Sequence, residues 1–352
     1  MNRPFPAKRR ILHRCLLAAL FSTAVTGLHV YGQDVPLVSG AVGFLANRNG
    51  GQSVFQPVLA PVIAAPLGEH ILVESRGELR NTWTENATGY PRAFTAGLQF
   101  LQADYIAHPR LVIVGGKFLT PFGSYNERLT PIWIPLFQEL PLTLGIGTRT
   151  SGASNGGMLR GVALNNEHAQ LNYTAYFSAG DNVHQFKAAR TAGLQTAAYF
   201  PTKRLEVGFS YQRFLQQVHT NAYGVHVWWL PPRSAFELRS EYDHGARAQG
   251  YWIELAYRLS RFGGPDTLVG RFEPAFRMQQ AFRNAPSFPG QADGLPGVDT
   301  QQIDFGFDYR LPHEFRLNSA YSRSFTTTRN KNLWDLSLTH RFLFPTWKGH
   351  PQ

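Results

Sequence analysis

The chain has 352 residues, with 34 Lys and Arg against 23 Asp and Glu, a formal net charge of +11 and a single Cys. One cysteine excludes a disulfide framework, so an exported chain of this size must be stabilised by a large folded structure of its own.

The first 32 residues predict a secretory signal peptide. The segment opens with five basic residues, which are Arg3, Lys8, Arg9, Arg10 and Arg14. The apolar run from Cys15 to Val30 is too short for a good spanning helix, and Gly32 suits signal peptidase cleavage. The alternative is a single membrane anchor. Cleavage would lower the net charge to +6, which removes the basis for a nucleic-acid-binding function.

The chain after Gly32 predicts strands rather than helices. It has no run of about 18 apolar residues, so no transmembrane helix is expected. Two weaker strand candidates, 39–47 and 53–65, are either the first strands or an N-terminal arm within residues 33–69. About 14 clearer strands follow, in which bulky apolar residues alternate with small or polar ones. They include 71–83, 94–100, 171–177, 205–212, 222–229, 236–242, 251–259, 303–310 and 334–344.

Two further features indicate that the apolar faces meet lipid. Aromatic residues cluster at strand ends with aliphatic residues between them, as in Tyr251, Ile253, Leu255 and Tyr257. Turns also alternate between short ones and longer ones, which is typical of a membrane barrel. The short examples are 199–204, 230–233 and 310–313, and the longer examples are 181–190, 216–220 and 281–300.

The sequence therefore predicts an all-β fold, a transmembrane antiparallel β-barrel within residues 33–344. About 16 strands are expected, in a range of 14 to 18, because such barrels have even strand numbers. Residues 345–352 form a C-terminal tail. In this interpretation Ile253 faces lipid, whereas Glu254 and Arg258 face the water-filled lumen.

One segment, 123–156, interrupts the strand pattern. It is long, rich in aromatic residues and bent by Pro131, Pro135, Pro141, Gly145 and Gly147. A long stretch without regular structure inside a compact domain is usually functional. It either folds into the lumen and sets the constriction, or covers the mouth of the barrel.

The stretch GKFLTPFG, from Gly116 to Gly123, resembles the strand-ending motif of the phosphate-selective porin family of the O and P type. The following Tyr125 to Leu129 also matches the acidic residue and leucine that tend to follow it. This resemblance implies an outer-membrane porin of a Gram-negative-type envelope, with basic residues that coordinate anions and a possible homotrimer. Leu119 departs from the family, because a lysine is common there.

The candidate solute contacts near the predicted constriction are Lys117, Arg128, Arg149 and Arg160. Further charges expected on the lumen face include Arg239, Glu254, Arg258, Arg271 and Arg310. Basic and acidic residues are equally frequent at the non-lipid positions of the strands, so many should pair across neighbouring strands. A strongly selective pore has rings of one sign, so only a mild anion preference is expected.

The expected function is passive diffusion of small hydrophilic solutes, possibly including phosphate, through an anion-preferring channel in contact with outer-membrane lipids. A plugged barrel for hydrophobic compounds is an alternative, with Val54 to Leu67 as the plug. An outer-membrane enzyme is less favoured, since there is no Gly-x-Ser-x-Gly or HExxH motif. No cofactor, metal site or nucleic-acid partner is expected. A soluble secreted β-sandwich disagrees with the aromatic pattern and with the strand 332–344, which resembles the terminal strand of outer-membrane barrels.

Overall fold

The computed structural model describes residues 36–108, 110–148, 152–180, 188–216, 219–286 and 293–345. They form a closed antiparallel β-barrel of 16 strands, in which each strand pairs with its neighbours in sequence and β1 closes onto β16. The first eight strands are β1 (Leu37–Asn49), β2 (Gln52–Leu67), β3 (Ile71–Thr84), β4 (Arg92–His108), β5 (Leu111–Leu119), β6 (Ala153–Asn165), β7 (Gln170–Gly180) and β8 (Arg190–Phe200). The last eight are β9 (Leu205–Phe214), β10 (Thr220–Trp229), β11 (Phe236–Gly245), β12 (Ala248–Tyr257), β13 (Phe272–Arg283), β14 (Thr300–Arg310), β15 (Phe315–Thr326) and β16 (Lys331–Pro345).

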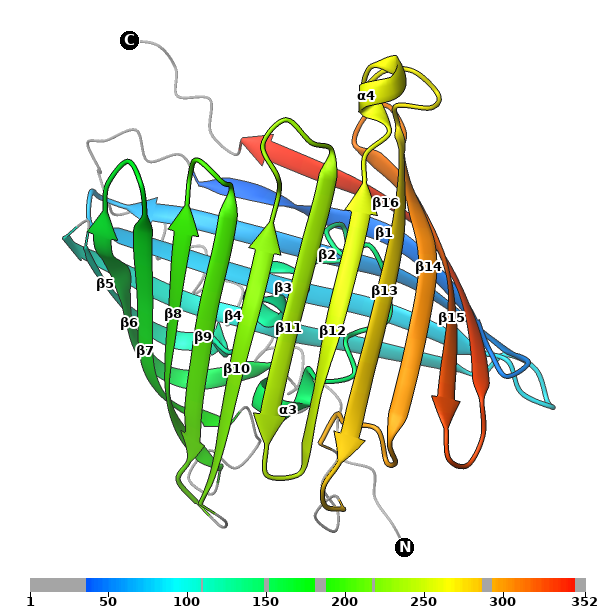
Figure 1. Ribbon diagram of the computed structural model, residues 1–352, viewed down its shortest axis with the longest axis horizontal. Coiled ribbons are helices and arrows are strands. Elements are labelled where there is room, and N and C mark those ends of the chain that lie inside the picture. The colour runs from blue at the N-terminus through cyan, green and yellow to red at the C-terminus, as the bar shows by residue number, and fades with distance from the viewer. Residues whose placement is uncertain are drawn as a thin grey trace, which may run out of the picture.

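Three one-turn helices lie in the connections: α2 (Tyr125–Arg128), α3 (Gly145–Thr148) and α4 (Ser260–Gly263). Figure 1 shows the strands from β7 to β13 standing at the front, with β1 to β4 crossing obliquely behind them. Strand tilt of this kind is required to close a sheet into a barrel. No helix in the described part of the chain is long and apolar enough to cross a membrane.

The alternation of exposed and buried side chains along β12 shows which face of the barrel wall is polar. Trp252 and Glu254 point inward and are 1% and 3% exposed, whereas Ile253 between them points outward and is 37% exposed. The same inversion holds around the barrel, with Arg277 fully buried inside and Phe305 exposed outside. A soluble protein would place these residue types the other way round. The predicted orientation of β12 is therefore confirmed, and a closed barrel with an apolar exterior is a fold that satisfies its backbone in lipid.

The two rims differ in the length of their connections. The start of β1 and the end of β16 share one rim with short turns such as 201–204 and 311–314, which we call the short-turn rim. On the opposite rim, β5 and β6, β7 and β8, and β13 and β14 are separated by longer stretches of sequence. The predicted alternation of turn lengths is present in part, because the opposite rim also has short turns at 50–51, 246–247 and 327–330. The β12–β13 connection, residues 258–271, lies on the short-turn rim although it is long and contains α4.

The N-terminal range left open by the sequence contributes β1 and β2 to the wall. Val54 to Leu67, the alternative plug, lies in β2 and pairs with β1 and β3. Residues 120–148 fold into the lumen and do not cover the mouth from outside, and β6 already begins at Ala153. The predicted signal peptide, residues 1–32, and the predicted tail after Pro345 lie outside the described residues.

Candidate functional site in the barrel lumen

The segment 120–152, which we call the lumen loop, begins and ends at one point of the wall. Asn126 on α2 donates from Nδ2 to the carbonyl oxygens of Thr120, at 3.0 Å, and Gly152, at 2.7 Å, and so joins the two ends of the loop. Gly123 turns the chain inward with a φ of 67°, a left-handed conformation that favours glycine. A Cβ atom at Gly123 would collide with the carboxylate of Glu241. The end of the GKFLTPFG motif is thus the entry of the chain into the lumen.

Polar side chains of the front wall hold the first part of the lumen loop. The backbone N–H and the hydroxyl of Ser124 both donate to Oε2 of Glu241 on β11, at 2.6 Å and 2.8 Å. Gln195 on β8 donates to the carbonyl of Gly123 at 2.6 Å. Gln212 on β9 donates to the carbonyl of Gly147 in α3 at 2.5 Å. Since these wall residues are mostly buried, the contacts satisfy groups that would otherwise lack partners.

Two arginines hold the middle of the loop against β13 to β15. Arg277 is fully buried, forms an ion pair with Asp304 at 2.7 Å and donates to the carbonyl of Glu139 at 2.9 Å. Its guanidinium also lies 4.7 Å from the ring centre of Phe137. Arg316 on β15 donates to the carbonyl oxygens of Trp133 and Pro135, at 2.6 Å and 2.5 Å. These contacts fix the middle of the loop to β13–β15, while Arg76 on β3 donates to the hydroxyl of Thr130 at 2.7 Å from the other side of the lumen.

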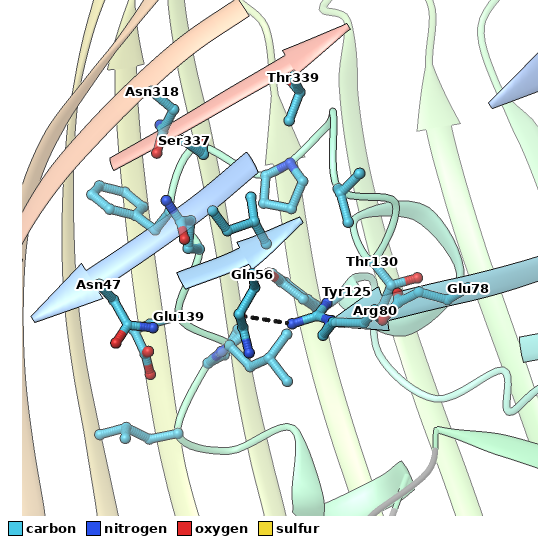
Figure 2. Close-up of a pocket in the computed structure, with 18 of the residues that line it drawn as sticks. Asn47, Gln56, Glu78, Arg80, Tyr125, Thr130, Glu139, Asn318, Ser337 and Thr339 are labelled. Atoms are coloured by element: carbon cyan, nitrogen blue, oxygen red, sulfur yellow. Dashed lines mark hydrogen bonds and ion pairs between the residues drawn. The ribbon is translucent and has the colours of Figure 1, made fainter. Parts of the chain in front are cut away.

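A cavity of about 570 Å³ remains between the loop and the opposite wall, which is built from β1, β2, β3, β15 and β16. The wall supplies neutral polar side chains, among them Asn47, Gln56 and Thr339. Figure 2 shows these residues around the open space, with Glu139 of the loop on the same side as Asn47. The loop adds an apolar edge from Ile132, Leu140 and neighbouring prolines. We call this space the lumen cavity.

The charged groups that line the lumen cavity balance each other. Arg80 donates to Glu78 at 2.9 Å and to the amide oxygen of Gln56 at 3.1 Å, as the dashed line in Figure 2 marks. Glu139 and Arg316 are the other charged lining residues in the described chain. Burial raises the pKa of Glu139, while the nearby Arg277 opposes this shift. The cavity thus offers two carboxylates and two guanidiniums to a passing solute.

Two of the predicted solute contacts meet around Glu127 in the lumen. Arg128 on α2 pairs with Glu206 at 2.6 Å, and Arg160 on β6 pairs with the carboxylate of Asp104. Burial raises the pKa of Glu127, and the positive charges of Arg160 and Arg128 counteract this effect. Neither arginine lines the lumen cavity. Arg149 lies outside the described residues.

Lys117 does not face the lumen, which corrects the prediction from the sequence. It pairs in register with Leu101 of β4 and Asn155 of β6, and Leu101 is 47% exposed on the outer face. Its neighbour Phe118 is fully buried inside, where it packs with Val114. Because residues opposite each other in a sheet share a face, Lys117 lies on the outside of the barrel.

The predicted lumen charges lie on the inner wall of β11 to β14, near the short-turn rim. Arg239 pairs with Glu237 and with Glu254, at 2.7 Å and 3.0 Å. Arg258 and Arg310 both pair with Glu273, at 3.1 Å and 2.8 Å, and remain about half exposed. Arg271 precedes β13 by one residue and accepts a backbone hydrogen bond from Arg310, so the two arginines are neighbours. The predicted pairing across neighbouring strands is present here.

Sequence reasoning missed the residues that shape the cavity. Glu139 and Gln138 lie in the lumen loop, where no strand pattern marks which side chains face the open space. Glu241 and Arg316 lie on strands, but their amide and carbonyl partners in the loop are distant in sequence. The density of proline and glycine in the segment was the available signal, and it indicated the loop without its contacts.

No group of His, Cys, Asp or Glu side chains within the described ranges could hold a metal ion. No protein-family model matches the chain, and no curated protein matches it. Solved structures do match. The barrel is similar to OmpF of Salmonella typhi in a complex with daunomycin, with a TM-score of 0.61 and 11% identity over 90% of this chain and 100% of the other. It is also similar to OprB of Pseudomonas putida, with a TM-score of 0.57 and 11% identity over 88% and 92% of the two chains.

A loop-deletion form of OmpT, an outer membrane protein of Vibrio cholerae, matches with a TM-score of 0.55 and 10% identity, over 88% of this chain and 100% of the other. At such low identity these likenesses show the fold alone. The chain therefore has the closed barrel fold of outer-membrane porin structures.

Proposed function

We propose that the protein is an outer-membrane porin of a Gram-negative cell envelope, which allows small hydrophilic solutes to diffuse passively through its lumen. The observation that carries this proposal is the lumen cavity, a polar space of about 570 Å³ between the lumen loop and the wall. A polar interior within an apolar exterior suits a water-filled path across lipid. No catalytic step and no cofactor form part of the proposal.

We further propose a mild preference for anions. The cavity itself has balanced charges, so the preference arises from the arginines around it. Arg258, Arg271 and Arg310 stand around the single carboxylate of Glu273 near the short-turn rim, which leaves a local excess of positive charge. Arg128, Arg160 and Arg149 are proposed as further solute contacts in the lumen, where Arg128 and Arg160 are paired with Glu206 and Asp104 and do not add to this excess. Phosphate is a candidate solute because guanidinium groups bind oxyanions with two parallel hydrogen bonds.

The outer surface supports a second proposal, that the barrel assembles with further copies of itself, as a homotrimer. From β8 to β16 the strand ends at the short-turn rim are mainly aromatic, namely Phe200, Trp229, Phe236, Tyr257, Phe272 and Phe315. Aromatic side chains favour the boundary between lipid and water. On β1 to β7 the corresponding ends are mainly aliphatic, among them Leu67, Ile71 and Leu164. Lys117 lies on the outer face of β5, towards the opposite rim, where a second subunit would shield it from lipid.

The experiment is single-channel recording of the refolded protein in a planar bilayer under a KCl gradient. Steady ohmic steps with a reversal potential on the chloride side support the proposal, and block by added inorganic phosphate would extend it to phosphate. Arg310→Gln should reduce the chloride preference, whereas Arg204→Gln, a change of equal charge in an exposed turn, should not. A barrel that inserts and conducts no ions would overturn the proposal and favour a closed barrel.

A further inference from the structure

The β12–β13 connection, residues 258–271, stands out from the other connections of the short-turn rim. Figure 1 shows it as the yellow segment labelled α4, which projects beyond the barrel wall. Its backbone is held by internal hydrogen bonds, from Gly264 N to the carbonyl of Ser260 at 2.9 Å and from Gly270 N to the hydroxyl of Thr267 at 3.0 Å. We call this segment the α4 hairpin.

The α4 hairpin exposes large apolar side chains although its backbone is ordered. Phe262 is 72% exposed and Leu268 is 76% exposed, which are the largest exposed fractions among the large hydrophobic residues of the described chain. Val269 beside them is 54% exposed. Exposing such a cluster to water is unfavourable, so its presence on an ordered segment indicates a contact surface.

The apolar cluster continues the outer face of the barrel. The ring of Phe262 lies 6.0 Å from the ring of Tyr257, which is the last outward residue of β12. Phe272, the first residue of β13, stacks on Phe307 of β14 with ring centres 4.7 Å apart. The surface that would face lipid thus extends from the aromatic strand ends onto the hairpin.

The charge of the hairpin suits an anionic surface. Arg261 on α4 is exposed, Asp266 is the single acidic residue of the hairpin, and Arg258 and Arg271 at the base belong to the lumen wall. Anionic lipid headgroups attract such basic groups at a membrane surface. Apolar side chains with flanking basic residues are the combination found in segments that bind the boundary region of a bilayer.

We propose that the α4 hairpin is an interfacial membrane anchor. Phe262, Leu268 and Val269 insert among the lipid headgroups of the leaflet at the short-turn rim, and Arg261 binds lipid phosphates. The hairpin thereby fixes the depth of the barrel in the bilayer on the side of β12 and β13. This inference rests on the proposed function only in requiring that the barrel spans a bilayer.

The test is site-directed spin labelling in a Cys15→Ser background, which leaves no other cysteine in the chain. Labels are placed at Leu268→Cys, at Ile253→Cys on the outer wall and at His168→Cys. His168 is an exposed residue in a turn of the same rim, so its label reports on water. The protein is reconstituted in vesicles of phosphatidylethanolamine and phosphatidylglycerol, and collision rates with oxygen and with a water-soluble nickel complex are measured.

We expect the nickel collision rate of the Leu268 label to be several-fold below that of the His168 label, and to rise when phosphatidylglycerol is replaced by phosphatidylcholine. A Leu268 label as accessible to nickel as the His168 label would overturn the anchor, and would leave the hairpin available to a soluble partner or a second copy. If the Ile253 label is also accessible to nickel, the barrel does not span the bilayer, and the proposed function itself fails.

Discussion

Replacing Arg277 with alanine should both destabilise the barrel and release the lumen loop. The side chain is fully buried, pairs with Asp304 and holds the carbonyl of Glu139. Removing one partner of a buried ion pair costs about 3–5 kcal/mol, because the remaining charge is left uncompensated. Without the hydrogen bond to Glu139, the middle of the loop loses one of its attachments to the wall.

The free energy of unfolding is measured by denaturant titration of the reconstituted barrel. The conductance is measured separately in a planar bilayer. Arg258→Ala is the matched control, because that arginine pairs with Glu273 but is about half exposed, and solvent-exposed pairs contribute about 0–1 kcal/mol. Arg277→Ala should lower the free energy of unfolding by the larger amount and give higher or noisier conductance. Arg277→Ala combined with Asp304→Asn should recover part of the loss. Equal stability and equal conductance of the two alanine variants would refute the role of Arg277 in fixing the loop.

Three further outcomes are expected. Ile253→Arg should cost about 2–4 kcal/mol of barrel stability in denaturant titration, since it places charge against lipid near the middle of β12, while Asn47→Arg inside the lumen should cost much less. Burial raises the pKa of Glu139 above its usual 4.5, so this carboxylate should be protonated, and lose its negative charge, at a higher pH than an ordinary glutamate. Acidification should therefore shift the reversal potential towards anions in that pH range, and Glu139→Gln should abolish this part of the shift. Gly123→Ala should strain a left-handed backbone position by about 1–3 kcal/mol and push against Glu241, which should appear as loop noise in single-channel recordings; an unchanged current trace would contradict the position of the hinge.

The alternation of residue types carried most of the fold prediction. In β10 and β12, large apolar side chains at every second position leave one arrangement in which all of them share a face, and the structure has it. The predicted position of Lys117 in the lumen was wrong for a physical reason. Its strand reads Val-Gly-Gly-Lys-Phe, and glycines carry no side chain that would mark a face, so the sequence alone does not fix the side on which the lysine points.

The lumen loop shows the other limit of sequence reasoning. Its length and its prolines predicted an irregular functional segment, but the contacts that hold it join residues far apart in the chain, such as Arg316 and Trp133. Those partners are backbone carbonyls, which every residue carries, so no residue type identifies them. The α4 hairpin was missed because its Gly-Gly-Pro-Asp stretch is typical of any turn.

The pairing of β1 with β16 has a consequence for how the chain folds. Each of the other contacts in the sheet joins strands that follow one another, so hairpins can form early and locally, whereas the closing seam joins the two ends of the barrel. Until that seam forms, the chain is an open sheet with two unpaired edges along its full length, and such edges pair readily with other chains. Closure is therefore the slow step, and the chain needs protection from aggregation until its last strand has paired with its first.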